Sequence, residues 1–169
     1  PYGIGYAQSV PPGAPFPYGP GAVVASVGGV PLEILAVGGV MLLLAWCRSL
    51  LTLAVLAAWI PAIEFGICGQ NDQVPAFLLL AGLLLIERRR WRSGAVLVAL
   101  SAAVKPYTLA WFAPLIGFGG VGMATVLALV SMVAWLPVAI WGIDGFLRSV
   151  EMARAIHPVP ENALDRPEL

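Results

Sequence analysis

The chain has 169 residues, of which 60% are hydrophobic and 11% are charged, and its formal net charge is zero. Its mean hydropathy is +0.90. A soluble domain normally has about a quarter of its residues charged, so this composition excludes a well-solvated globular domain and indicates a polytopic integral membrane protein. The zero net charge argues against a nucleic-acid partner.

We expect an all-α fold, a transmembrane bundle of about five spanning helices preceded by an N-terminal loop. Residues 1–20 are rich in proline, glycine and aromatic residues and carry no charge. Proline removes a backbone donor and glycine raises the entropic cost of a helix, while aromatic rings settle at membrane–water interfaces. We interpret residues 1–20 as an extracytoplasmic, interfacial loop.

Hydrophobic runs separated by few charges fill residues 21–143, which we interpret as the transmembrane region. A helix needs roughly 20 apolar residues to cross a bilayer. Two runs are short by this standard, and the last, at 38 residues, is too long for one helix, so we expect it to turn within residues 117–120. The runs cover residues 21–47, 49–63, 74–86, 93–104 and 106–143.

Arginine placement predicts the orientation of the chain. Short loops rich in lysine and arginine remain in the cytoplasm, and segment 87–92 holds four arginines. If the spans alternate, Arg48 lies on the same, cytoplasmic side. Loop 1–20 and the polar segment 64–73 then lie on the extracytoplasmic side.

The path of the chain after Lys105 has two solutions. If residues 93–116 form one helix kinked at Pro106, its roughly 24 residues rise about 36 Å, which is enough to cross, and Arg148 reaches the cytoplasm. If the chain instead turns back at Lys105 and Pro106, two half-length helices form and the polar tail, residues 144–169, ends outside. Length and charge favour the first path, and the side of the tail stays open.

The most informative polar stretch is Gln70-Asn71-Asp72-Gln73, which lies between two apolar runs at the expected outer surface. Asn71 or Asp72 is placed to cap the helix that follows, with Pro75 in its first turn, and capping alone would explain these residues. Alternatively, the amides and the carboxylate line a polar cavity. Such groups donate and accept hydrogen bonds, as sugar hydroxyls require, and a helix N-terminus favours an anionic ligand.

Lys105, followed by Pro106 and Tyr107, is a cation between apolar runs. Such a lysine costs roughly 2.5–3.5 kcal/mol at the middle of a membrane, which makes it a candidate functional residue. Its natural partner is a phosphate or a carboxylate, and Glu33 and Glu64 are candidates. The alternatives are a lysine that extends to the interface and carboxylates that reach headgroup water.

No metal site is predicted, because His157 has no histidine or cysteine close to it in the sequence. Cys47 and Cys68 lie at opposite ends of one hydrophobic run. A spanning helix would hold them farther apart than the ~7 Å that a disulfide allows between Cα atoms, so we expect two free thiols.

The segment GQNDQVPAFLLLAGLLLIERRRWRSGAVLVALSAAVKPYTLAWFAPL, together with the upstream PFPYGPGA, resembles the central region of bacterial GT-C membrane glycosyltransferases, especially glycosyltransferase family 87 and its mannosyltransferase relatives. The shared order is a Gly-Gln-Asn-Asp-like loop, a short helix, a basic loop, a helix rich in small residues, and Lys-Pro. The chain departs from the family at GFGG, residues 117–120, where a second basic loop is often found.

The resemblance implies transfer of a mannose-like hexose or a pentose from a polyprenyl-phosphate donor to a lipid or glycan acceptor, without a cofactor or metal, in a multi-pass protein of the plasma membrane. The implied substrate-binding residues are Gln70, Asn71, Asp72, Lys105, Tyr107 and Tyr18. A general base is expected in an external loop upstream of this chain. The catalytic residue is therefore unknown, and we expect this chain alone to be inactive.

Two other functions compete with this interpretation. A transporter or permease subunit would also have short, broken spans and a buried lysine, although no clear internal repeat is found and the polar stretch lies at a surface. In a non-catalytic membrane scaffold, Asp72 would only cap a helix and Lys105 would only extend to the interface.

Overall fold

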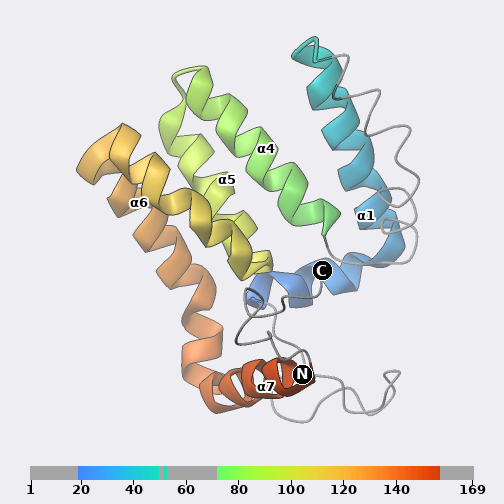
Figure 1. Ribbon diagram of the computed structural model, residues 1–169, viewed down its shortest axis with the longest axis vertical. Coiled ribbons are helices and arrows are strands. Elements are labelled where there is room, and N and C mark those ends of the chain that lie inside the picture. The colour runs from blue at the N-terminus through green and yellow to red at the C-terminus, as the bar shows by residue number, and fades with distance from the viewer. Residues whose placement is uncertain (1–18, 50–51, 53–71, 157–169) are drawn as a thin grey trace, which may run out of the picture. The chain divides into compact units, whose positions relative to one another are not determined.

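The structure is a computed structural model that describes residues 19–49, 52 and 72–156. No strand occurs among these residues, as expected for an all-α fold. The chain divides into two compact units, one of residues 18–136 and one of residues 1–17 and 137–169. The helices are α1 (Pro20–Trp46), α4 (Gln73–Glu87), α5 (Trp91–Val104), the 3-10 helix η1 (Pro106–Trp111), α6 (Phe112–Trp141) and α7 (Ile143–Ile156), shown in Figure 1.

Helix α1 consists of two pieces joined by a bend at Gly29 (Figure 1). Gly29 has φ 53° and ψ −152°, a conformation that only glycine adopts without strain. Pro31 follows two residues later, in the first turn of the second piece, where its missing N–H breaks no helical hydrogen bond. The bend gives the second piece, which contains Glu33, a direction of its own.

Helices α4 and α5 form a close antiparallel hairpin in the unit of residues 18–136 (Figure 1). A Cβ atom added to Gly82 would lie 2.8 Å from the carbonyl oxygen of Gly94, and one added to Gly94 would lie 2.5 Å from that of Gly82. The two backbones can therefore approach only because both residues lack a side chain. At the other end of the hairpin, the Ser101 hydroxyl donates to the Pro75 carbonyl oxygen at 2.8 Å.

The second piece of α1 runs along α4 in the same direction. Glu33 contacts the start of α4, and a Cβ added to Gly39 would lie 2.6 Å from the Phe77 ring. At the far end, the Arg88 guanidinium lies 4.8 Å from the centre of the Trp46 ring. Parallel directions are what we expect of the first and third spans of an alternating chain. Arg48, two residues after Trp46, thus lies at the arginine-rich end, as predicted.

The chain turns back at Lys105, so the expected single helix over residues 93–116 is wrong and the reversal expected in the alternative path is confirmed, while the side of the tail stays a prediction. Helix α5 ends at Val104, and Lys105 is extended, with φ −130° and ψ 115°. The residue before a proline is disfavoured in helical conformation. Leu115 in the first piece of α6 belongs to the same core cluster as Val98 of α5. The chain therefore runs back along the helix it has just left.

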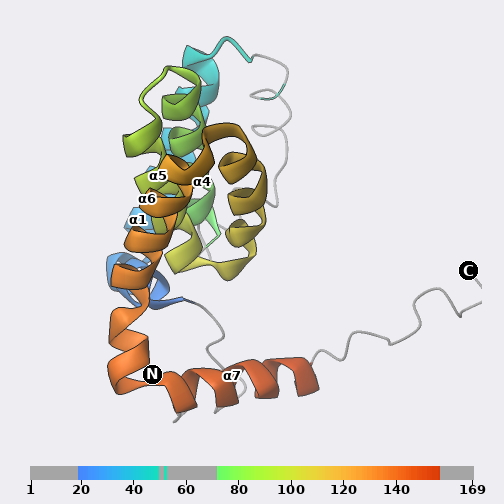
Figure 2. The ribbon, with the colours of Figure 1, turned by 90° about the vertical axis from the view of Figure 1, so that its left-hand side faces the viewer.

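A second reversal occurs at Gly120, within the predicted turn at residues 117–120. Gly120 has φ 61° and ψ −152°, and it divides α6 into two pieces joined by a sharp turn (Figure 2). A Cβ added to Gly122 would lie 3.3 Å from the Trp91 ring at the start of α5, and one added to Gly19 would lie 3.1 Å from the ring of Trp135. Gly19 lies at the end of α5, because its N–H donates to the Val104 carbonyl oxygen. The second piece of α6 therefore begins beside the start of α5 and runs towards the end of α5.

The hydrophobic core of this unit lies between α4, α5 and both pieces of α6. The buried side chains of α5 are small, which lets the neighbouring helices approach closely. The core cluster consists of Ile86, Ala95, Val98, Ala99, Leu115, Met123 and Leu127.

Two helical segments among the described residues are long and apolar enough to cross a membrane, Val27–Trp46 and Pro106–Ile140. Helices α4 and α5 have 15 and 14 residues. At 1.5 Å per residue they are about 22 and 21 Å long, which is shorter than the ~30 Å hydrocarbon layer. The expectation of five spans is therefore not confirmed. The run at 49–63 and the loop at 1–20 lie almost wholly outside the described residues.

Helix α7 follows α6 after a break of one residue at Gly142 and belongs to the unit that contains residues 137–169. The sequence interpretation gave this stretch no element, because it treated residues 144–169 as a polar tail. Apolar residues recur at helical spacing at Ile143, Phe146, Leu147 and Val150, which is the period that favours a helix.

Candidate functional site

Lys105 is fixed at the junction of α5 and η1 by hydrogen bonds on both sides of its backbone. Its N–H donates to the Ser101 carbonyl oxygen at 3.0 Å, and its carbonyl oxygen accepts from the Thr108 N–H at 3.2 Å and from the Thr108 hydroxyl at 3.0 Å. Thr108 is fully buried, and Lys105 is 8% exposed. The sequence Lys-Pro thus ends α5 and holds a cation inside the protein.

The Lys105 ammonium group pairs with the carboxylate of Asp72. Its Nζ lies 2.7 Å from Asp72 Oδ1, and the side chain of Lys105 is 10% exposed, against 41% for Asp72. A charge-assisted contact of this length is among the stronger hydrogen bonds in proteins. Residues 33 positions apart in the chain are thereby joined at the start of α4 and the end of α5.

Glu33 supplies a second carboxyl group to the same place. It is 1% exposed, and its Oε2 accepts a hydrogen bond of 3.1 Å from the N–H of Gln73, the first residue of α4. Its other oxygen, Oε1, is buried and has no hydrogen-bond partner among the described residues. The charges of Asp72 and Lys105 both lie close enough to the Glu33 carboxyl group to interact with it electrostatically.

The start of α1 packs against the end of α5 beside this cluster. A Cβ added to Gly19 would clash with the Ala103 carbonyl oxygen, and one added to Gly21 would lie 2.9 Å from the Val104 side chain. The start of α1 can lie there only because both residues are glycine. The candidate site, defined by Glu33, Asp72 and Lys105, thus lies where α1, α4 and α5 meet, at the end of the hairpin opposite the arginines.

Of the predicted substrate-binding residues, the structure brings Asp72 and Lys105 into contact. Tyr107 is 58% exposed and lies within electrostatic range of Asp72. The remaining predicted positions, Tyr18, Gln70 and Asn71, lie outside the described residues, as do Glu64, Cys68 and His157.

Two interpretations of single residues are wrong. The expected cap of α4 was Asn71 or Asp72. Asp72 occupies the position before α4, but its side chain makes no capping hydrogen bond to a described residue, so it is not that cap, and Asn71 lies outside the described residues. Lys105 does not extend to the interface, because it is almost fully buried.

From the sequence, Glu33 is either a partner of Lys105 or a carboxylate that reaches the water among the lipid headgroups. Its burial excludes the second interpretation. The signal that could have indicated its role is a carboxylate within an apolar run two residues after proline. Among the residues that the structure covers, no group of three or more histidine, cysteine, aspartate or glutamate side chains is arranged to hold a metal.

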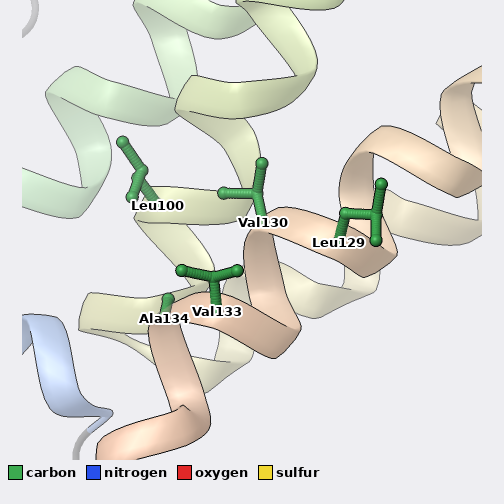
Figure 3. Close-up of a pocket in the computed structure, with 5 residues that line it drawn as sticks. All are labelled: Leu100, Leu129, Val130, Val133 and Ala134. Carbon is green, nitrogen blue, oxygen red and sulfur yellow. The ribbon is translucent and has the colours of Figure 1, made fainter.

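An apolar groove of about 290 Å³ lies between α5 and the second piece of α6 (Figure 3). One lining residue, Leu100, comes from α5, the helix that ends next to Lys105, and the others come from α6. The groove is lined by Leu100, Leu129, Val130, Val133 and Ala134, all of them apolar.

The model of glycosyltransferase family 87 matches residues 1–164 of the chain. No curated protein matches the chain. No solved structure matches it either.

Proposed function

Since the chain belongs to glycosyltransferase family 87, a family of membrane glycosyltransferases, we propose that it transfers a mannose-like hexose or a pentose from a polyprenyl-phosphate donor to a lipid or glycan acceptor. We place the protein in the plasma membrane with several spans. The observation that carries this proposal is the ion pair between the nearly buried Lys105 and the exposed carboxylate of Asp72 at the N-terminus of α4.

The ion pair suits a lipid-linked sugar phosphate. An ammonium group has three donors, so Lys105 can hold Asp72 and a phosphate oxygen together. The exposed carboxylate of Asp72 can accept hydrogen bonds from sugar hydroxyls. The positive end of the α4 dipole adds to the attraction for a phosphate.

In the proposed reaction, the acceptor hydroxyl oxygen attacks the anomeric carbon of the sugar. The bond from that carbon to the phosphate oxygen breaks, and its electron pair leaves with the polyprenyl phosphate. The hydroxyl proton passes to a general base, which the family resemblance assigns to an upstream external loop. Because the phosphate gains negative charge as the bond breaks, Lys105 stabilises the transition state more than the bound substrate.

The apolar groove supports the same proposal. A polyprenyl chain is a hydrocarbon and requires an apolar surface near the position of its phosphate. Leu100 lies on the helix that ends beside Lys105, and all five lining residues are apolar (Figure 3).

Transfer by the full-length protein from a polyprenyl-phosphate sugar donor tests the proposal. We expect Lys105→Ala to lower kcat/KM by roughly a hundredfold, the effect of removing one electrostatic stabiliser, and Asp72→Asn to lower it as well. Lys105→Arg should keep part of the activity, because it keeps the charge.

Matched controls are the exposed residues Arg92 and Glu151, whose variants Arg92→Ala and Glu151→Gln should transfer normally. Normal transfer by both site variants, Lys105→Ala and Asp72→Asn, would show that this pair is not the site.

A further inference from the structure

Glu33 is a carboxyl group in the middle of an apolar helix. It lies within the segment Val27–Trp46, which is long and apolar enough to cross a membrane, and it is 1% exposed. Burying such a group is costly unless it is paired or hydrogen-bonded. Its position therefore requires a compensating contact, and that contact is the start of α4.

The cap of α4 comes from a distant residue. Aspartate at the position before a helix normally accepts a hydrogen bond from the second or third N–H of that helix. Asp72 holds this position, yet its carboxylate points to Lys105 and makes no capping bond to a described residue. The first N–H of α4, that of Gln73, instead donates to Glu33 across 40 positions of the sequence.

We propose that Glu33 is a positioning residue for the site: it caps α4 and thereby leaves the carboxylate of Asp72 to hold Lys105. Two carboxylates thereby divide two tasks: Glu33 accepts from the N–H of Gln73, and Asp72 holds Lys105. The consequence for catalysis rests on the proposed function, whereas the capping of α4 by Glu33 does not.

A purely stabilising role explains the geometry less well. Glu33 Oε1 is buried and makes no hydrogen bond to a described residue, and desolvating a carboxyl group costs stability. The bend that precedes Glu33 places Gly29 at φ 53°. Such local costs are expected at functional sites, where they are offset elsewhere in the fold.

The test compares Glu33→Leu and Glu33→Gln in the full-length protein. Leucine removes the acceptor of the Gln73 N–H, so hydrogen exchange at the start of α4 should become roughly tenfold faster, and kcat/KM should fall roughly tenfold. Glutamine keeps an oxygen acceptor, so both quantities should stay within about threefold of the wild type. Glu33→Leu combined with Lys105→Ala should transfer no more slowly than Lys105→Ala alone, because Glu33 acts through that pair.

Leu127→Ala is the matched control, because Leu127 is a buried core residue remote in sequence from the site. It should lower thermal stability without faster exchange at the start of α4. Unchanged exchange in Glu33→Leu would overturn the inference, and so would a Glu33→Gln variant that loses transfer while its exchange stays normal. If the wild-type protein transfers from no polyprenyl-phosphate donor, the proposed function fails, while the exchange measurements still decide whether Glu33 caps α4.

Discussion

At the scale of single residues, the geometry of the site depends on which carboxylate binds the Lys105 ammonium group and which one accepts from the first N–H of α4. Asp72, Glu33 and Lys105 can be recognised in the sequence as polar residues beside or within apolar runs. Their pairing could not be predicted, because Glu33 is as good a partner for Lys105 as Asp72 on charge alone. In the structure the first N–H of α4 donates to Glu33, while Asp72 pairs with the lysine.

Glycine is a second residue-scale determinant, and Gly94 is the clearest case. We predict that Gly94→Ala lowers the free energy of unfolding by about 1–3 kcal/mol, because the new Cβ would lie 2.5 Å from the Gly82 carbonyl oxygen and force the two helices apart. Denaturant unfolding of the purified protein in detergent measures the change.

The matched control is Gly38→Ala in α1, where a Cβ meets nothing within 4 Å. This variant should gain up to about 1 kcal/mol, since alanine favours a helix over glycine. Equal stability of the two variants would contradict the close approach of α4 and α5.

At the scale of elements, the chain reverses its direction at Lys105 and again at Gly120. The sequence predicted the second reversal better than the first. The turn at Gly120 was predicted, because a run of 38 apolar residues interrupted by glycines cannot be one span. The sequence favours the path without a reversal at Lys105, since the length of residues 93–116 suits a crossing. The sequence does not show which surface the returning chain packs against. In the structure it packs against the small buried side chains of α5.

The turn at Gly120 can be tested by substitution. Gly120→Ala should lower stability by about 1–3 kcal/mol, because φ 61° with ψ −152° strains any residue that has a Cβ. Thermal unfolding followed by circular dichroism measures the loss.

Gly117→Ala is the control, because a Cβ there also meets nothing within 4 Å and its φ lies outside the positive range. A Gly120→Ala variant as stable as Gly117→Ala would show that residue 120 does not adopt this conformation.

At the scale of the whole molecule, the reversals change the expected side of the tail. The second piece of α6 brings Trp135 to the end of α5 that bears Lys105, opposite the arginine-rich loop. We predict that Arg148 lies on the extracytoplasmic side, whereas charge alone favours the cytoplasm.

We predict that a cysteine at position 148 reacts with a membrane-impermeant maleimide in intact cells, in a background where Cys47 and Cys68 are replaced by serine. A cysteine in place of Arg89, in the exposed loop between α4 and α5, should react only after the membrane is permeabilised. Labelling of both positions from the same side would refute the path proposed for α6.

The sequence by itself determined the class of this protein, its helical content, its arginine-rich end and the family to which it belongs. These depend on composition, local periodicity and the order of motifs, and all of them are read from neighbours in the chain. Only the tertiary structure decided that the chain turns back at Lys105, that Glu33 caps α4 and that Asp72 holds the lysine. Each of these depends on which distant groups satisfy a buried donor or fill the space beside a small side chain, and local sequence marks the residues involved but does not decide between their possible partners.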